Sequence, residues 1–82
     1  MRAKILKAVA DGTRFLILGK IGRGEVCACE LPKAAGTSQP AVSQHLKVLL
    51  GAGLVSVRRD GAKRLYSVSG KGRRVLSDIR RW

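Results

Sequence analysis

The segment Ser38–Leu50, with the sequence SQPAVSQHLKVLL, decides the fold. Its first serine can cap a helix, and the proline that follows in the first turn favours a helix start at this point. Val42, Leu46 and Leu49 recur at helical spacing and predict one buried stripe. The face opposite that stripe is small and polar, and it carries Pro40, Ser43, Gln44 and Lys47.

This polar face has the properties that a helix needs to enter the major groove of DNA. It has little bulk, it carries side chains that can hydrogen-bond to base edges, and the free amides at its N-terminus favour phosphate. Gln39 and Gln44 are the best candidates for reading bases, because an amide can donate and accept together at adenine. The alternative interpretation is an ordinary polar surface on a core helix. His45 lies beside the buried stripe, and we interpret it as a boundary histidine bonded to backbone or phosphate.

A shorter helix is expected just before this one. Pro32 is tolerated in a first turn, so this helix begins near Cys29 or Glu30 and continues to Ala35. The tight turn Gly36-Thr37 joins it to the helix that starts after Ser38. Two helices joined in this way have the proportions of a helix-turn-helix.

Two further helices are predicted upstream. Apolar residues at helical spacing indicate a short helix over Ala3–Val9, with Ile5 and Leu6 on its apolar face. Asp11 then offers an N-cap oxygen for a second helix from about Thr13 to Ile21.

After the helix-turn-helix the periodicity changes to alternation. Leu54 to Arg59 and Arg64 to Val68 are predicted as two strands around Asp60-Gly61, which is a strong hairpin signal. The last segment, from about Lys71 to Trp82, returns to helical spacing.

The length of the hairpin loop decides which residues face each other. A two-residue loop sets Arg58 opposite Lys63, whereas a four-residue loop sets Arg59 opposite Arg64. We expect the longer loop, because it also matches apolar residues across the two strands. Either register pairs like charges, which is destabilising by up to about 1 kcal/mol unless an anion lies between them.

The basic charge is concentrated near this hairpin. The chain carries a formal charge of +12, and nine of its 17 basic residues lie in the last 25 positions. A solvated edge hairpin, whose charges prevent aggregation of strands, is one interpretation. Phosphate binding by the hairpin tip explains the rest of the basic excess better.

The overall composition excludes several classes of protein. Eighty-two residues are enough for one domain, and 45% hydrophobic residues are too many for a disordered basic tail. No stretch approaches the ~18 consecutive apolar residues of a membrane span, and the N-terminus leads into a charged amphipathic segment instead of a signal peptide. We therefore expect a soluble, cytoplasmic protein without a membrane partner.

A domain of this size is marginal on its own, so apolar stripes at its two ends favour a homodimer. The residues expected in the dimer interface are Ile5, Leu6, Val75, Ile79 and Trp82. Residues 1–82 are expected to form one domain of mainly α class with a small antiparallel β-hairpin, in the order α-α-α-α-β-β-α.

Whether the two cysteines, Cys27 and Cys29, can bind one ion depends on the backbone conformation between them. In an extended segment, residues two apart point to the same side, so both sulfurs can bind one ion; in a helix they diverge by about 200°. Ion binding therefore requires that the helix start stays or becomes unwound. Thiolates select soft ions such as Cd(II), Zn(II) or trivalent arsenic. Two ligands are too few for a closed structural zinc site, so no ion is expected to be required for the fold.

Five motifs follow one another in order over roughly residues 5 to 68. They are ADGTR at 10–14, EVCACEL at 25–31, SQPAVSQHL at 38–46, GLV at 53–55 and RDG at 59–61. In this combination the sequence resembles the ArsR/SmtB-type winged helix-turn-helix repressors. The resemblance implies a homodimer joined through its N- and C-terminal helices, which binds operator DNA when metal-free and is released when a thiophilic ion binds the Cys-x-Cys segment.

The resemblance also assigns roles to residues. It implies that Cys27 and Cys29 are ligands of the inducing ion and that Gln39, Ser43, Gln44 and Lys47 read DNA. Together with the helix start, the histidine and the hairpin, the expected DNA-contacting residues are Ser38, Gln39, Ser43, Gln44, His45, Lys47, Arg58, Arg59, Lys63 and Arg64.

The chain departs from the family pattern in ways that leave the inducer open. The third thiol that some arsenic repressors hold beyond the pair falls at Pro32, and Gly12 stands where a proline is usual. The predicted C-terminal helix lacks the His and acidic ligands that the zinc sensors of the family carry there.

Other functions remain as alternatives at this stage. One is a winged-helix regulator whose cysteines form a redox switch or sense nothing, and another is an abundant architectural protein that binds nucleic acid through charge alone. We do not expect an enzyme, because the single histidine has no acidic partner at suggestive spacing and the cysteines lie in no nucleophile motif.

Overall fold

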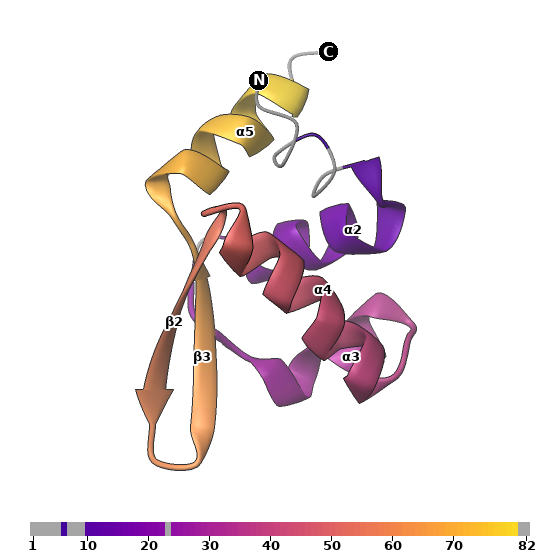
Figure 1. Cartoon of the computed structure of the whole chain (residues 1–82), viewed down its shortest axis with the longest axis vertical. Helices are drawn as coiled ribbons and strands as arrows, with labels where there is room; N and C mark the ends of the chain where they lie inside the picture. Colours follow the sequence, from indigo (N-terminus) through magenta and orange to yellow (C-terminus); the bar gives the residue numbers. More distant parts are fainter. Residues whose placement is uncertain (1–5, 7–9, 23, 81–82) are drawn as a thin grey trace.

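The computed structural model describes residues 6, 10–22 and 24–80 of the chain. Its helices and strands follow the predicted order from the second helix onward (Figure 1). They are α2 (Gly12–Ile21), β1 (Val26–Cys27), a 3-10 turn (Ala28–Glu30), α3 (Leu31–Ala35), α4 (Gln39–Gly51), β2 (Val55–Asp60), β3 (Lys63–Val68) and α5 (Gly70–Arg80). The helix expected over Ala3–Val9 lies outside the described residues, except for Leu6.

Local capping explains where the helices begin and end. Asp11 caps α2 as predicted, with its carboxylate accepting from the backbone N–H groups of Thr13 at 2.9 Å and Arg14 at 3.1 Å. The bond from the Arg14 backbone is the main reason that the pKa of Asp11 lies below its ordinary value. At the other end of the next helix, Gly36 has φ 66 and caps α3 in the left-handed conformation. The turn of the helix-turn-helix depends on this glycine.

The sheet has one strand more than the sequence predicted. Its order is β1-β3-β2, with both outer strands antiparallel to β3. Strand β1 has two residues, Val26 and Cys27, paired with Tyr66 and Leu65. A two-residue strand shows no alternation in the sequence, and this is why no strand was predicted there.

The helix that follows β1 also begins later than expected. The prediction was an α-helix from Cys29 or Glu30; the α-helix begins at Leu31, and Ala28–Glu30 form a 3-10 turn before it. Pro32 lies in the first turn of α3, as predicted.

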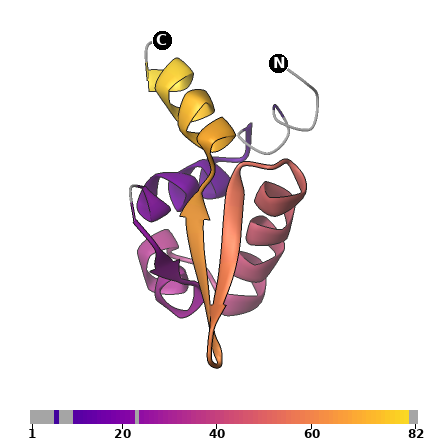
Figure 2. The same cartoon turned by 90° about the vertical axis from the view of Figure 1, so that its left-hand side faces the viewer.

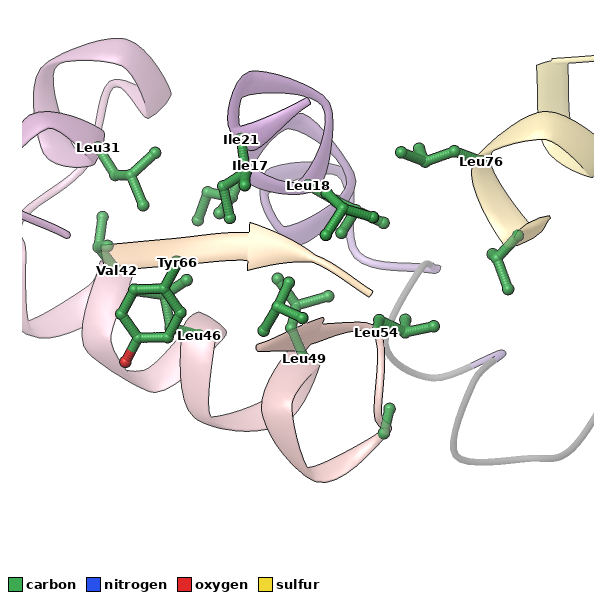
Figure 3. Close-up of a cluster of buried hydrophobic side chains, with 14 residues drawn as sticks. Ile17, Leu18, Ile21, Leu31, Val42, Leu46, Leu49, Leu54, Tyr66 and Leu76 are labelled. Carbon is green, nitrogen blue, oxygen red and sulfur yellow. The ribbon is translucent and has the colours of Figure 1, made fainter. Parts of the chain in front are cut away.

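A single aliphatic core joins the helices to one face of the sheet (Figure 3). The predicted stripe on α4 is fully buried, and it meets apolar residues of α2, α3, the hairpin and α5. The core residues are Ile17, Leu18, Ile21, Leu31, Val42, Leu46, Leu49, Ala52, Leu54, Val55, Tyr66, Val68, Val75 and Leu76. The polar face of α4 is left on the surface, beside the hairpin.

The hairpin and α5 extend from opposite ends of this core. In both views the turn between β2 and β3 lies at one end of the molecule and α5 lies at the other (Figures 1 and 2). Helix α4 runs beside the hairpin in each view, and α4 contacts β2. This arrangement sets the polar face of α4 next to the basic strands.

Candidate nucleic-acid interface

The start of α4 is built as the sequence predicted. Ser38 is its N-cap, with its hydroxyl accepting from the Ala41 N–H at 3.3 Å, and the first turn contains the proline. On the opposite side from the buried stripe, four polar side chains are exposed to solvent, those of Gln39, Ser43, Gln44 and Lys47. Their exposure leaves their hydrogen-bonding groups available to a ligand.

The strand register of the hairpin is the one expected for the longer loop. Arg59 lies opposite Arg64, Val57 opposite Tyr66 and Val55 opposite Val68. Pairing continues one step further than predicted, to Asp60 and Lys63, so the connection itself is a two-residue turn. Gly61 in this turn has φ 62, a conformation that favours glycine.

Arg58 and Glu25 form an ion pair that the sequence did not reveal. The Arg58 Nη2 and Nε atoms donate to the two carboxylate oxygens of Glu25 at 2.8 and 2.9 Å. These hydrogen bonds lower the pKa of Glu25 and raise the pKa of Arg58. Sequence reasoning did not find this ion pair, because it depends on β1, which brings Glu25 to the sheet. The Arg58 side chain stays 57% exposed, so its remaining N–H groups are still available for the phosphate contact expected from the sequence, while Glu25 offsets its charge.

An open groove of about 590 Å³ lies where α4, the hairpin tip and the cysteine segment meet. Three groups of side chains line it: Cys27, Ala28 and Cys29; Gln39, Ser43, Gln44 and Lys47; and Lys63 and Arg64. Apolar side chains of Leu46, Leu50 and Tyr66 also contribute to its wall. Six of the ten predicted DNA-contacting residues and both cysteines therefore meet at one surface.

The two sulfurs of the cysteine segment lie on the same side of the chain. Cys27 is extended, with φ −67 and ψ 135, and Cys29 lies in the 3-10 turn that follows. Their Sγ atoms are 2.6 Å apart, and both cysteines are free thiols. The chain is therefore not α-helical at the pair, since the α-helix begins only at Leu31.

The surroundings of the pair favour the protonated form of one thiol. The hydrogen bond to Cys27 is the main cause that raises the pKa of Cys29, and slight desolvation and the nearby Glu30 carboxylate act in the same direction. The Glu30 carboxylate also accepts from the Cys27 N–H at 3.2 Å. Within the part of the chain that the structure describes, no third His, Cys, Asp or Glu joins the pair as a cluster.

His45 lies away from the groove. It is half-buried, and its Nδ1 is 3.4 Å from Nη1 of Arg14 on α2, close to the α2 cap Asp11. This position agrees with a boundary histidine, but its partner is an α2 side chain. The expected contact of His45 with DNA therefore has no support in its surroundings.

The residues expected in a dimer interface differ in their exposure. Leu6 is 52% exposed and Ile79 is half-buried against the core, whereas Val75 is 6% exposed within the core of the chain itself. Val75 therefore has little surface left to offer a partner subunit. Ile5 and Trp82 lie outside the described residues.

Among the described helices, none has the length and apolar character needed to cross a membrane.

With this geometry in place, comparison with known proteins identifies the family. The family model described as bacterial regulatory protein, arsR family, matches residues 1–57. The chain belongs to the ArsR family. ArsR-family proteins are transcriptional regulators and not enzymes, and the fold of this member is the winged helix-turn-helix, with β2 and β3 as the wing.

Two curated relatives and one solved structure illustrate the similarity. A probable mercury resistance operon repressor of Streptomyces lividans is 50% identical over 66 residues, which is 80% of this chain and 53% of the relative. An arsenical resistance operon repressor of Staphylococcus aureus is 40% identical over 75 residues, covering 92% of this chain and 69% of the relative. This chain thus spans about half to two thirds of the length of these relatives.

The solved structure is a homodimeric winged helix-turn-helix DNA-binding domain from Mycobacterium bovis, a possible ArsR-family regulator. It superimposes with a TM-score of 0.86 at 30% identity, covering 95% of this chain and 73% of that chain. The winged fold assigned from the sequence is therefore confirmed.

Proposed function

We propose that this ArsR-family chain is a homodimeric transcriptional repressor that binds operator DNA and is released by a thiophilic ion at Cys27 and Cys29. One observation carries the proposal: the polar face of α4, the basic wing tip and the cysteine pair line the same groove. The names of the mercury and arsenical resistance repressors to which the chain is similar support the same function.

The DNA-binding part follows from the shape and charge of this surface. Helix α4 would enter a major groove, with Gln39 and Gln44 at base edges and Lys47 near the backbone. The wing would contact flanking phosphate through Lys63 and Arg64, which are both exposed. In a dimer, two half-sites about one helical turn apart would match the two α4 helices.

The sensing part follows from the chemistry of the thiols. Two sulfurs on the same side of the chain can chelate one soft ion once they separate to the spacing its bonds require, and trivalent arsenic, Cd(II) and Hg(II) are ions of this class. Binding replaces thiol protons, and the raised pKa of Cys29 makes this replacement harder at low pH. We therefore expect the affinity for the ion to increase as the pH rises from 6 to 8.

The central experiment first selects bound duplexes from random DNA, with and without arsenite. Fluorescence anisotropy then measures the affinity for the selected operator while arsenite or Cd²⁺ is added. We expect the ion to release DNA from the wild-type protein and to leave the double variant Cys27→Ala/Cys29→Ala bound. Unchanged DNA affinity of the wild type at saturating ion would remove the sensing part of the proposal.

The same assay separates the alternatives. A redox switch predicts that protein oxidised with hydrogen peroxide and reduced protein differ in operator affinity, without any effect of the ion. A nonspecific architectural protein predicts equal affinity for unrelated duplexes and a steep salt dependence, whereas a repressor keeps a preference of ~10³-fold or more for its operator.

The proposed dimer interface can be tested by substitutions on α5. Ile79 is the described interface candidate with surface still available on this helix, so Ile79→Lys should give monomers in sedimentation experiments and weaken operator binding. Ser77→Lys, at an exposed position of the same helix, adds the same charge and should leave the dimer intact. A dimer that survives Ile79→Lys would rule out this interface.

A further inference from the structure

Tyr66 of β3 is a buried residue that also lines the groove between α4 and the wing tip. Only 8% of Tyr66 is exposed, and its ring belongs to the aliphatic core. In Figure 3 its oxygen points away from Ile17 and Leu18. The ring is therefore part of the core, whereas the hydroxyl lies at the edge of the core.

The Tyr66 hydroxyl forms no hydrogen bond within the part of the chain that the structure describes. Every fully buried side-chain oxygen or nitrogen in that part has a partner, so the Tyr66 oxygen is not fully buried. It opens instead on the groove that the residue lines. Because a buried tyrosine usually has a partner for its hydroxyl, we expect this one to find its partner in the groove.

The charges of the groove favour an anionic partner for this hydroxyl. The described residues that line the groove include three cations, Lys47, Lys63 and Arg64, and no carboxylate. Arg64 and Tyr66 are two positions apart on β3, so they lie on the same face of the sheet. An O–H donor beside these cations suits a phosphate oxygen, and tyrosine is one of the side chains that contact DNA phosphate.

The packing of its ring distinguishes Tyr66 from the cations of the groove. Lys63 and Arg64 are exposed, so DNA binding has to immobilise two long, flexible side chains. The Tyr66 ring is already fixed in the core, and its backbone is paired on both sides, with Val57 of β2 and Val26 of β1. The hydroxyl is therefore a donor whose position is set before DNA binds.

On this basis, and resting on the DNA binding of the proposed function, we propose that the Tyr66 hydroxyl donates a hydrogen bond to a backbone phosphate of operator DNA. The exposed cations attract the strand, and the rigid donor fixes its position between α4 and the wing. Phosphate contacts of this kind set the register of a protein on the duplex without reading the sequence themselves. Tyr66 is thus a DNA contact contributed by the core, beyond the ten contacts predicted from the sequence.

The first test removes only the oxygen, with Tyr66→Phe. Operator affinity should fall about tenfold, because a hydrogen bond to a charged acceptor is lost. The slope of log K against log salt should stay the same, since the hydroxyl carries no charge. The urea midpoint of the free protein should not fall, since the hydroxyl has no partner among the described residues. Fluorescence anisotropy at several salt concentrations and urea denaturation measure these quantities.

Ser67→Ala is the matched control. It removes a hydroxyl from the next position on β3, which lies on the opposite face of the sheet and outside the groove lining, so operator affinity should not change. Unchanged operator affinity of Tyr66→Phe, a lowered urea midpoint, or an equal loss from Ser67→Ala would overturn the inference and leave the proposed function standing. A wild-type protein without preference for a selected operator would overturn both.

The second test locates the acceptor on the DNA. A methylphosphonate replaces one phosphate oxygen with a methyl group and removes the charge, and it can be placed at one position of the operator at a time. At one phosphate of each half-site, this replacement should weaken binding of the wild type about tenfold more than binding of Tyr66→Phe, which lacks the donor. Equal losses for the two proteins at every position would contradict the inference.

Discussion

The two faces of the wing differ in whether their arginines are neutralised by a carboxylate. Neighbouring residues of a strand point to opposite faces of a sheet, so Arg58 and Arg59 lie on different faces of the wing. Arg58 is held by both oxygens of Glu25, whereas Arg59 lies opposite Arg64, and neither forms an ion pair within the described part of the chain. The chain thus neutralises charge on one face and leaves like charges together on the other. An anion from outside is the natural partner of the second face.

The largest effect is expected at the wing tip, where one cation from each face lines the groove. The double variant Lys63→Ala/Arg64→Ala removes both wing cations that line it. Operator affinity at moderate salt should fall about 100-fold, and the slope of log K against log salt should decrease by about 2. Fluorescence anisotropy at several salt concentrations gives both quantities.

A matched control is available at the other end of the molecule. Arg73→Ala/Arg74→Ala removes the same charge from exposed positions on α5. It should change affinity far less than the wing variant. Equal losses from the two double variants would mean that total charge, and not the groove, determines binding.

The contrast between the faces also explains what sequence reasoning could and could not find. The helix at Ser38, the stripe on Val42 and the strand register were predicted, because each follows from local periodicity or from pairing across a short turn. The Glu25–Arg58 pair was not predicted because it joins positions 33 residues apart. Strand β1 was not predicted because it is too short to show a pattern.

The candidate site was also predicted only in part, for the same reason. The α4 face and the wing tip could be assigned from residue type and spacing, but their meeting with the cysteines in one groove is a tertiary fact. The contact of His45 with Arg14 of α2 could not be predicted for the same reason, because the two residues are 31 positions apart.

The next prediction concerns the base of the wing, which both faces share. A Cβ at Gly72 of α5 would collide with the Leu54 carbonyl oxygen and lie 2.8 Å from Val68 Cγ1. Gly72→Ala should therefore lower the free energy of unfolding by about 2 kcal/mol, measured by urea denaturation. Gly70→Ala is the control, because its Cβ would meet nothing within 4 Å, and it should be nearly neutral. Comparable stability of the two variants would show that α5 does not pack tightly on the base of the wing.

A smaller effect should separate base reading from charge on the groove side. Gln44→Ala removes an exposed amide and no charge. Affinity for the selected operator should fall about tenfold, in the lower part of the ~1–3 kcal/mol that a good base contact provides, while affinity for random DNA should not change. Competition binding with both duplexes measures the two. Equal losses on operator and random DNA would place Gln44 against the backbone.

The smallest effect is expected on the neutralised face. Because Arg58 holds the pKa of Glu25 below its ordinary value of 4.5, the ion pair stabilises the fold above that value and is lost as the pH falls through the lowered pKa. Urea midpoints of wild type and Glu25→Gln should therefore differ slightly at pH 7 and converge in acid. A difference that persists or grows in acid would show that the ion pair is not its source.

The same variant tests whether the two faces are separate in function. Glu25→Gln releases Arg58, and Asp78→Asn on exposed α5 makes the same change in net charge without breaking that pair or touching the wing. If DNA contacts only the unneutralised face, the two variants should bind operator equally. A higher affinity of Glu25→Gln alone would mean that the released Arg58 reaches phosphate, so that Glu25 restrains binding and the neutralised face also belongs to the interface.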